Sequence, residues 1–276
     1  MRVAIDAGHG SNTAGKRTPD GYREHYINVM AANACAGYLQ KRGIEVVKTG
    51  WDDEDATDDP DIGLTTRQKQ VRASKCDLSV SFHANASGDG KSYNSAAGVE
   101  TFFHIIGARS KDSQKLAALV QKHLVKGTPQ RDRGTKPGNL AMCNALAMET
   151  KASVLCEIGF MTNREEALLM MSEAFCREQG QDAARGVLEY LGIQDTPETP
   201  EKPEPVPKEI KVRINIDDLN IRKGPGTDYP KTGRYTGRGV FTIIEKIEAG
   251  KGSKAGWGKL KSGAGWISMD FCEIYK

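Results

Sequence analysis

Two histidines stand where strands of a sheet are expected to end. His9 follows the apolar run of residues 3–5 within the segment Asp-Ala-Gly-His-Gly, and His83 follows the run of residues 78–82. In open α/β sheets, ligand sites lie beyond the carboxyl ends of the strands. Imidazole nitrogens bind zinc, and a hydrolytic zinc site has three protein ligands and one open position. The two histidines therefore predict a metal site at one edge of a sheet.

The third ligand is expected to be a carboxylate at the same edge. Glu24 opens a predicted helix soon after His9, and the helix dipole favours a negative charge at that end. His25 is the alternative, but neighbouring residues of a helix point about 100° apart, so both cannot comfortably face one ion. We favour Glu24, because Asn28 follows one turn later on the same face.

A further acid, Glu157, interrupts the otherwise apolar strand predicted at residues 153–158. A lone carboxylate is costly to bury unless it is paired or functional. Burial raises the pKa of a carboxyl group, which suits a general base that takes a proton from water. Taken singly, each of these residues has a structural alternative: a hydrogen-bonded histidine, a first-turn acid or a salt-bridged core acid. Their joint position at one predicted edge favours a site.

The elements that must position these residues alternate along residues 1–193. Strands are expected at residues 2–6, 44–49, 77–83, 99–104 and 153–158. Helices are expected at residues 24–42, 64–75 and 109–126. The capping-box pair Asn163 and Glu166 is expected to open a further helix, and a final helix to end near Leu191. This order predicts an α/β fold, with a mixed, mostly parallel sheet flanked by helices on both faces. The long polar loops at residues 84–97 and 127–138 are expected to form the rim of a groove.

The composition changes after residue 193. Five of the eleven prolines fall between Pro197 and Pro207, so residues 194–209 are expected to form an extended linker. Residues 210–276 contain short strand-like runs between glycine- and proline-rich turns, which predicts a small all-β barrel. This part carries 13 basic and 7 acidic side chains, which favours attraction to a polyanionic surface.

Several classes of protein are excluded. The hydrophobic content of 38% and charged content of 27% suit a globular chain with its own core. No apolar run approaches the ~18 residues that cross a bilayer, so no membrane insertion is expected. We find no phosphate-binding loop and no nucleic-acid-binding motif. The first residues read as a strand and not as a leader, so we expect synthesis in the cytoplasm without a signal peptide.

Four segments together resemble the motif set of zinc-dependent N-acetylmuramoyl-L-alanine amidases, which degrade bacterial cell walls. The segments are residues 6–10, Glu24 with Asn28, residues 81–86 and residues 157–163. The resemblance covers about residues 1–192, with Ala7 at a position where the family often has proline. It implies one Zn²⁺ per catalytic domain, held by His9, Glu24 and His83, with Glu157 as the catalytic glutamate.

The same resemblance suggests where substrate is bound. Arg133 and Lys136 belong to a stretch that is similar to one beside the substrate groove of the family. Asn85 lies in the same motif as His83. These three residues are the expected substrate contacts.

The C-terminal residues resemble a bacterial SH3-like domain. The similar segments are residues 219–227, 256–260 and 265–268. Such modules commonly bind cell-wall peptides, so Trp257 and Trp266 are candidate wall-binding residues. The alternative is that both rings fill the small barrel. A dimerisation element is a further alternative for this domain, so the sequence leaves the oligomeric state open.

The resemblance implies hydrolysis of the amide bond between N-acetylmuramic acid and L-alanine in peptidoglycan, with Glu157 as general base for zinc-activated water. The missing leader favours a phage or prophage endolysin that acts on the wall after release, with a bacterial autolysin as the alternative. A zinc peptidase acting on the stem peptide is a second reading, because the same chemistry cuts any amide. A non-catalytic wall-binding protein is the third, and the presence of all four site residues argues against it.

Overall fold

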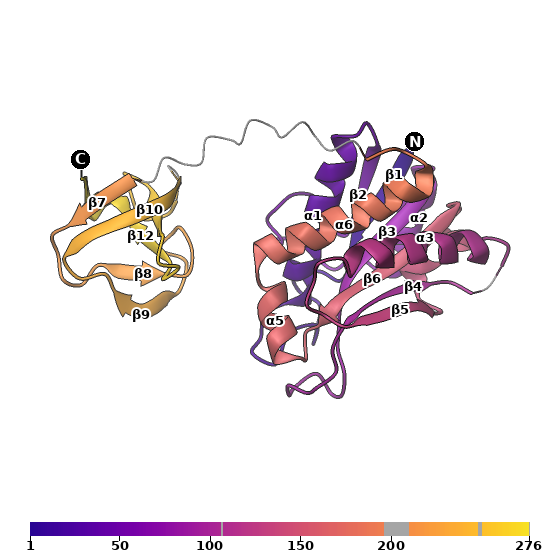
Figure 1. Ribbon diagram of the computed structural model, residues 1–276, viewed down its shortest axis with the longest axis horizontal. Helices are drawn as coiled ribbons and strands as arrows, with labels where there is room; N and C mark the ends of the chain where they lie inside the picture. Colours follow the sequence, from indigo (N-terminus) through magenta and orange to yellow (C-terminus); the bar gives the residue numbers. More distant parts are fainter. Residues whose placement is uncertain (106, 196–209, 248–249, 276) are drawn as a thin grey trace. The chain divides into compact units, whose positions relative to one another are not determined.

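The computed structural model describes residues 1–105, 107–195, 210–247 and 250–275 (Figure 1). The chain divides into two compact units, Met1–Asp195 and Thr196–Lys276. The predicted linker at residues 194–209 lies, from residue 196 onward, outside the described residues.

A six-stranded sheet forms the centre of the first unit. Its strands, in spatial order, are β2 (Glu45–Thr49), β1 (Arg2–Ala7), β3 (Leu78–Asn85), β6 (Ala152–Phe160), β4 (Val99–Phe103) and β5 (Asp132–Pro137). Strand β1 pairs in parallel with β2 and β3, and β3 pairs in parallel with β6. The pairing of β4 with β6 is antiparallel, and β5 pairs in parallel with β4. The predicted mixed, mostly parallel sheet is therefore confirmed.

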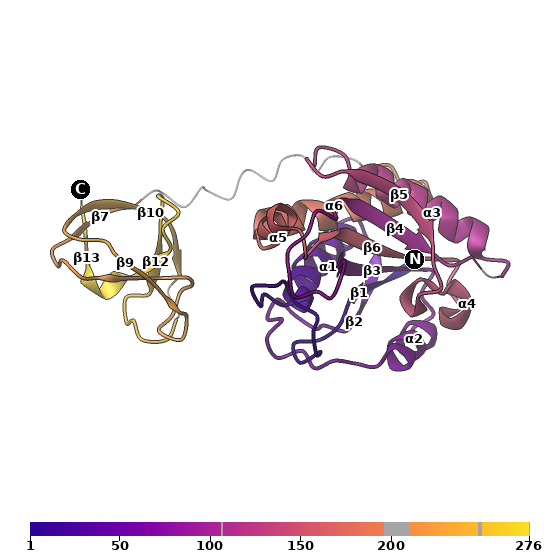
Figure 2. The ribbon, with the colours of Figure 1, turned by 90° about the horizontal axis from the view of Figure 1, so that it is seen from below.

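Helices cover both faces of this sheet (Figure 2). One face carries α1 (Glu24–Gln40), α3 (Ser110–Leu124) and α6 (Glu173–Leu191), with α6 packed against both others. The other face carries α2 (Leu64–Ala73), α4 (Ala145–Met148) and the 3₁₀ turn η1 (Ala141–Cys143). Helix α5 (Arg164–Met170) follows β6. None of the described helices combines the length and the hydropathy that a bilayer span requires.

The alternation of side chains along β1 decides which residue meets which helix layer. Val3 and Ile5 belong to the large core beneath α1, α3 and α6, whereas Ala4 belongs to the smaller core on the side of α2. Successive side chains of a strand point to opposite faces, so Asp6 emerges on the same side as Ala4. A carboxylate is thereby directed toward α2.

One predicted loop is wrong in part, because residues 132–137 form strand β5. The sequence Asp-Arg-Gly-Thr-Lys-Pro lacks apolar alternation. Strand β5 is the last strand of the sheet, and none of its residues is fully buried. Hydrogen bonding to β4 therefore forms this strand without a hydrophobic signal. Helix α4 and turn η1 were not predicted, because elements of three or four residues are too short to show a period.

The second unit is all-β, as predicted. Its strands are β7 (Ile210–Ile214), β8 (Asn220–Arg222), β9 (Lys231–Tyr235), β10 (Gly239–Ile247), β11 (Trp257–Leu260), β12 (Trp266–Ser268) and β13 (Cys272–Ile274). They form an antiparallel sheet in the order β13-β7-β10-β11-β12-β8-β9, with the 3₁₀ turn η2 (Met269–Phe271) before β13. Its small core includes Val212, Ile214, Ile243, Leu260 and Ile267.

The close packing of α6 on α1 generates a test of the fold. A methyl group at Gly180 would lie 2.1 Å from the carbonyl oxygen of Ala31, so the two helices would have to separate. We expect Gly180→Ala to lower the free energy of unfolding by about 1–3 kcal/mol. The matched control is Gly37→Ala on α1, where a methyl group meets nothing within 4 Å. Helix propensity predicts a gain of about 0.5–1 kcal/mol there. Urea unfolding of both variants checks the contrast, and equal effects would contradict it.

Candidate active site

Four of the predicted site residues lie at one edge of the sheet. Strand β1 leads into the turn that holds His9, and β3 and β6 carry His83 and Glu157. Glu24 is the first residue of α1. His83 and Glu157 are direct partners in the β3–β6 register, so their side chains emerge on the same side of the sheet. The carboxyl ends of three parallel strands thus bring together residues from four segments.

The turn after β1 has an unusual backbone. His9 has φ of 64°, in the left-handed region that a residue with a Cβ rarely adopts. The residue before it must be glycine for a different reason: a Cβ at Gly8 would lie 2.2 Å from the ring of His83. This turn therefore allows the His83 imidazole to lie directly against the backbone of the β1 end.

The Glu24 carboxylate lies between the two imidazoles. Its Oε2 is 3.3 Å from Nε2 of His9, and its Oε1 is 3.0 Å from Nδ1 of His83. The backbone N–H of Ala84 also donates to Oε1, at 3.2 Å. The two rings are edge-on to each other with centroids 4.8 Å apart. One ligand atom from each of His9, Glu24 and His83 lies within 4.8 Å of the others.

The electrostatics of this cluster favour a charged Glu24. Burial by itself would raise the pKa of Glu24, but the hydrogen bonds from His83 and His9 outweigh burial and hold the pKa well below its usual range. For His83, burial by itself would lower the pKa, but the hydrogen bond and the negative charge of Glu24 raise it. The cluster therefore holds a carboxylate and two imidazole donors that all converge on one small volume.

Glu157 has the opposite character. Burial raises its pKa to about 8; His83 lowers it, whereas the negative charges of Glu24 and Glu100 add to the rise. Its Oε2 atom is buried and has no hydrogen-bond partner among the described residues. A carboxyl group with a free buried oxygen and a pKa near neutrality is suited to accept and return a proton.

The predicted substrate contacts lie at unequal distances from this edge. Asn85 Nδ2 donates to Glu100 Oε1 at 2.8 Å, and Arg133 Nε donates to Glu100 Oε2 at 2.7 Å. Glu100 is the register partner of Glu157, so Asn85 and Arg133 both lie beside the site. Lys136 pairs with Phe102, whose partner on β6 is Leu155, two residues before Glu157. The structure therefore places Lys136 farther from the site edge.

His25, the rival ligand, does not belong to the ligand cluster. Its Nδ1 lies 2.9 Å from the carbonyl oxygen of Gly8, and its Nε2 lies 3.0 Å from Oδ2 of Asp59. A carbonyl oxygen only accepts, so Nδ1 is the donor. The buried imidazole thus ties the turn before His9 to the loop that contains Asp59, and Glu24 is the residue of this pair that faces the two histidines.

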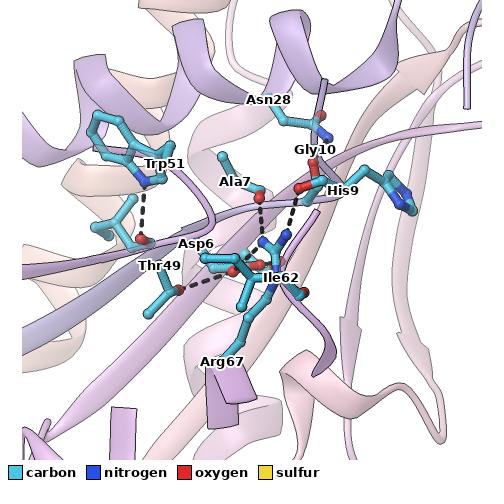
Figure 3. A network of polar contacts seen from close by, with 12 residues as sticks. Asp6, Ala7, His9, Gly10, Asn28, Thr49, Trp51, Ile62 and Arg67 are labelled. Carbon is cyan, nitrogen blue, oxygen red and sulfur yellow. Dashed lines mark hydrogen bonds and ion pairs between the residues drawn. The ribbon is translucent and has the colours of Figure 1, made fainter. Parts of the chain in front are cut away.

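Sequence reasoning missed Arg67 on α2. Its side chain is 1% exposed, and its Nη1 donates to Asp6 Oδ1 at 2.9 Å (Figure 3). The same guanidinium contacts the carbonyl oxygens of Ala7, His9 and Ile62. The one available signal was Asp6, a carboxylate at the end of an apolar strand that needs a partner. Nothing in the polar sequence of α2 distinguishes Arg67 from its charged neighbours.

Both predicted wall-binding residues are buried in the second unit. Trp257 is 2% exposed and Trp266 is 8% exposed. Lys259 Nζ lies 5.5 Å from the centroid of the Trp266 ring. Neither indole presents a ring face to solvent in this arrangement.

Comparisons with known proteins match the first unit. A family model described as N-acetylmuramoyl-L-alanine amidase matches residues 3–189. The uncharacterized protein YqiI of Bacillus subtilis is 31% identical over 188 residues, which cover 68% of this chain and 84% of that protein. The endolysin of Bacillus phage SPP1 is 27% identical over 197 residues, which cover 70% of this chain and 66% of the endolysin.

Solved structures agree with these matches. The catalytic domain of the N-acetylmuramoyl-L-alanine amidase CwlV from Bacillus (Paenibacillus) polymyxa var. colistinus aligns with a TM-score of 0.60 and 29% identity, over 70% of this chain and 99% of that one. An N-acetylmuramoyl-L-alanine amidase from Clostridium difficile aligns with a TM-score of 0.59 and 30% identity, over 70% and 97%. Since the family model spans most of the chain, this protein belongs to the N-acetylmuramoyl-L-alanine amidase family.

Proposed function

We propose that this protein is a zinc-dependent hydrolase that cuts the amide bond between N-acetylmuramic acid and L-alanine in bacterial peptidoglycan. Membership of the amidase family supports the reaction class. The observation that carries the proposal is the convergence of His9, Glu24 and His83 on one volume, beside a Glu157 whose pKa is raised to about 8.

The residues of the cluster fit a zinc ion. Two imidazole nitrogens and one carboxylate oxygen form a donor set of hydrolytic zinc sites, and three protein ligands leave a fourth position for water. Glu24 is buried between the imidazoles and its pKa is held low, so its carboxylate is available there to a cation. A bound zinc ion supplies a Lewis acid for the amide carbonyl and lowers the pKa of water.

Glu157 is the proposed general base. Its unpartnered Oε2 accepts a proton from the attacking water while the water oxygen forms a bond to the carbonyl carbon. The carboxylic acid then returns the proton to the nitrogen of L-alanine as the carbon–nitrogen bond breaks. The products are a free lactyl carboxylate on the sugar and a peptide with a free amino terminus.

Asn85 and Arg133 are the proposed substrate contacts beside Glu157. Both hold Glu100 in place, and the guanidinium of Arg133 also lies 4.9 Å from the ring centroid of Phe160. Lys136 is the proposed contact for a more distant part of the glycan or peptide, because it lies farther from the site edge.

The domain organisation and the role of the second unit also belong to this proposal. We assign residues 1–193 to the catalytic domain, 194–209 to a linker and 210–276 to an SH3-like wall-binding domain. The antiparallel strands and the excess of basic residues support this assignment. Direct contact of Trp257 and Trp266 with the wall would require these buried rings to become exposed, so the better-supported role for them is to pack the unit from within.

The similarity to a phage endolysin supports action on the cell wall in that setting, and an autolysin is the alternative. A stem-peptide zinc peptidase and a non-catalytic wall-binding protein are the competing functions. Mass spectrometry of digested walls separates all three. An amidase releases intact stem peptides with an N-terminal L-alanine, a peptidase leaves L-alanine attached to the sugar, and a binding protein releases nothing.

Glu157→Gln tests the general base. We expect hydrolysis of purified walls to fall roughly 100- to 10,000-fold, because the amide cannot accept the proton. Glu165→Gln, on the exposed surface of α5, is the matched control and should keep wild-type activity. Near-wild-type lysis by a folded, zinc-loaded Glu157→Gln protein would refute the assignment.

The pH dependence follows from the same carboxyl group. Only the ionised form of Glu157 accepts a proton, so kcat/KM should fall as the pH falls through its pKa. Burial raises that pKa to about 8, and a nearby cation lowers it, so the acid limb is expected below pH 8. Rates on a soluble muropeptide across the neutral range measure the limb. Zinc occupancy over the same range separates it from protonation of the histidines.

Metal removal tests the ligand set. A chelator should abolish hydrolysis, and added zinc should restore it. Zinc at one hundred times its Kd should add about 2.7 kcal/mol to the free energy of unfolding of the unaltered protein. His83→Ala should lose this gain, whereas His123→Ala should keep it, because His123 of α3 pairs with Glu189 of α6 and does not belong to the ligand cluster. Equal zinc stabilisation of both variants would exclude His83 as a ligand.

A further inference from the structure

Arg67 is a large, fully buried side chain with no part in the proposed chemistry. Its guanidinium makes many more contacts than its charge requires. The carboxylate of Asp6 alone would balance the charge, at 2.9 Å from Nη1. The remaining N–H groups donate to the carbonyl oxygens of Ala7 at 2.5 Å, of Ile62 at 2.7 Å and of His9. Nη2 also lies 3.5 Å from Oδ1 of Asp61. Figure 3 shows the guanidinium directed at the backbone carbonyl groups of Ala7 and His9.

These contacts hold a backbone that would otherwise relax. His9 keeps φ at 64°, and such a conformation persists only where the surroundings determine it. Arg67 binds the carbonyl groups of Ala7 and His9, while the carbonyl of Gly8 between them accepts hydrogen bonds from Asn28 Nδ2 at 3.1 Å and from His25 Nδ1 at 2.9 Å. Three successive carbonyl groups are thus bound by buried side chains.

Asp6 is itself held in place by two further hydrogen bonds. Its Oδ1 accepts from Thr49 Oγ1 at 2.9 Å, and its Oδ2 accepts from Ser81 Oγ at 2.5 Å. Ser81 is two residues before His83 on β3. The same acid therefore connects the strand that precedes His9 with the strand that carries His83.

We infer that Arg67 is a positioning residue for the metal site: it holds the left-handed turn that directs Nε2 of His9 toward Glu24 and His83. The inference rests on the proposed zinc site. Loss of this hold should weaken zinc binding in a protein that still folds, because His9 would then sample ordinary backbone conformations in which its ring is directed elsewhere.

Arg67→Lys is the informative variant. Lysine keeps a positive charge opposite Asp6, but its compact ammonium has three donors and no planar fork, so it cannot hold the same set of carbonyl groups. Arg42→Lys is the matched control. Arg42 is also a largely buried arginine that binds a carboxylate, Asp195, at 2.7 Å, and a carbonyl, that of Tyr38, at 3.2 Å. It follows the end of α1, about 25 Å along the helix axis from Glu24.

The experiment measures zinc Kd by competition with a chelating dye, and melting temperature by circular dichroism, on the full chain. We expect Arg67→Lys to raise the Kd for zinc roughly 10- to 100-fold, as loss of a group that orients a ligand typically does. Its kcat at saturating zinc should stay close to wild type. The Kd of Arg42→Lys for zinc should be unchanged, even if its melting temperature falls by as much as that of Arg67→Lys.

Gly50→Ala provides a second variant if Arg67→Lys does not fold. A methyl group there would lie 1.8 Å from Nη1 of Arg67 and 2.5 Å from the carbonyl oxygen of Ala7, at a residue with φ of 81°. It would therefore disturb the contact between Arg67 and this carbonyl without changing any charge. It should also raise the Kd for zinc. A folded Arg67→Lys or Gly50→Ala protein that binds zinc with the wild-type Kd would overturn the inference. If the unaltered protein binds no zinc, that result refutes the proposed metal site itself, and with it the inference about Arg67.

Discussion

The buried ion pair between Arg67 and Asp6 is the interaction on which the catalytic unit depends. Both side chains are almost completely withdrawn from water, and removing one member of such a pair typically costs about 3–5 kcal/mol. Further hydrogen bonds to both members stabilise the buried pair. Asp6 binds Thr49 and Ser81, and Arg67 binds three carbonyl groups. The end of β1 and the segment before α2 must therefore take the conformations that supply those acceptors.

The active-site edge separates two carboxyl groups by their surroundings. Glu24 accepts hydrogen bonds from two imidazoles and one backbone N–H, which stabilise its charged form. Glu157 lies on the same edge but leaves one buried oxygen without a partner, close to two other acids. Opposite shifts of neighbouring carboxyl groups are what the proposed metal ligand Glu24 and the proposed proton acceptor Glu157 require. The register of β3 against β6 sets this contrast, because it places Glu157 beside His83.

The pattern of elements could be predicted where the sequence carries a hydrophobic period. The strands that became β1, β3 and β6 are apolar runs, and the mixed, mostly parallel sheet followed from their alternation with helices. Strand β5 was missed, because an edge strand with polar residues on both faces has no such period. Arg67 was missed for a related reason. A charged residue on a polar helix looks solvated until the helix is seen to pack over Asp6.

The sequence by itself determined which residue types stand at the strand ends, because strand and helix periods act within one element and can be read from it. The prediction that His9, Glu24, His83 and Glu157 lie at the ends of strands or of a helix follows from these periods. Only the tertiary structure decided that Glu24 faces the histidines while His25 binds Asp59, that Arg67 holds the turn of His9, and that Trp257 and Trp266 are buried. These outcomes depend on contacts between segments far apart in the chain, and no local period encodes which of two neighbouring side chains makes them.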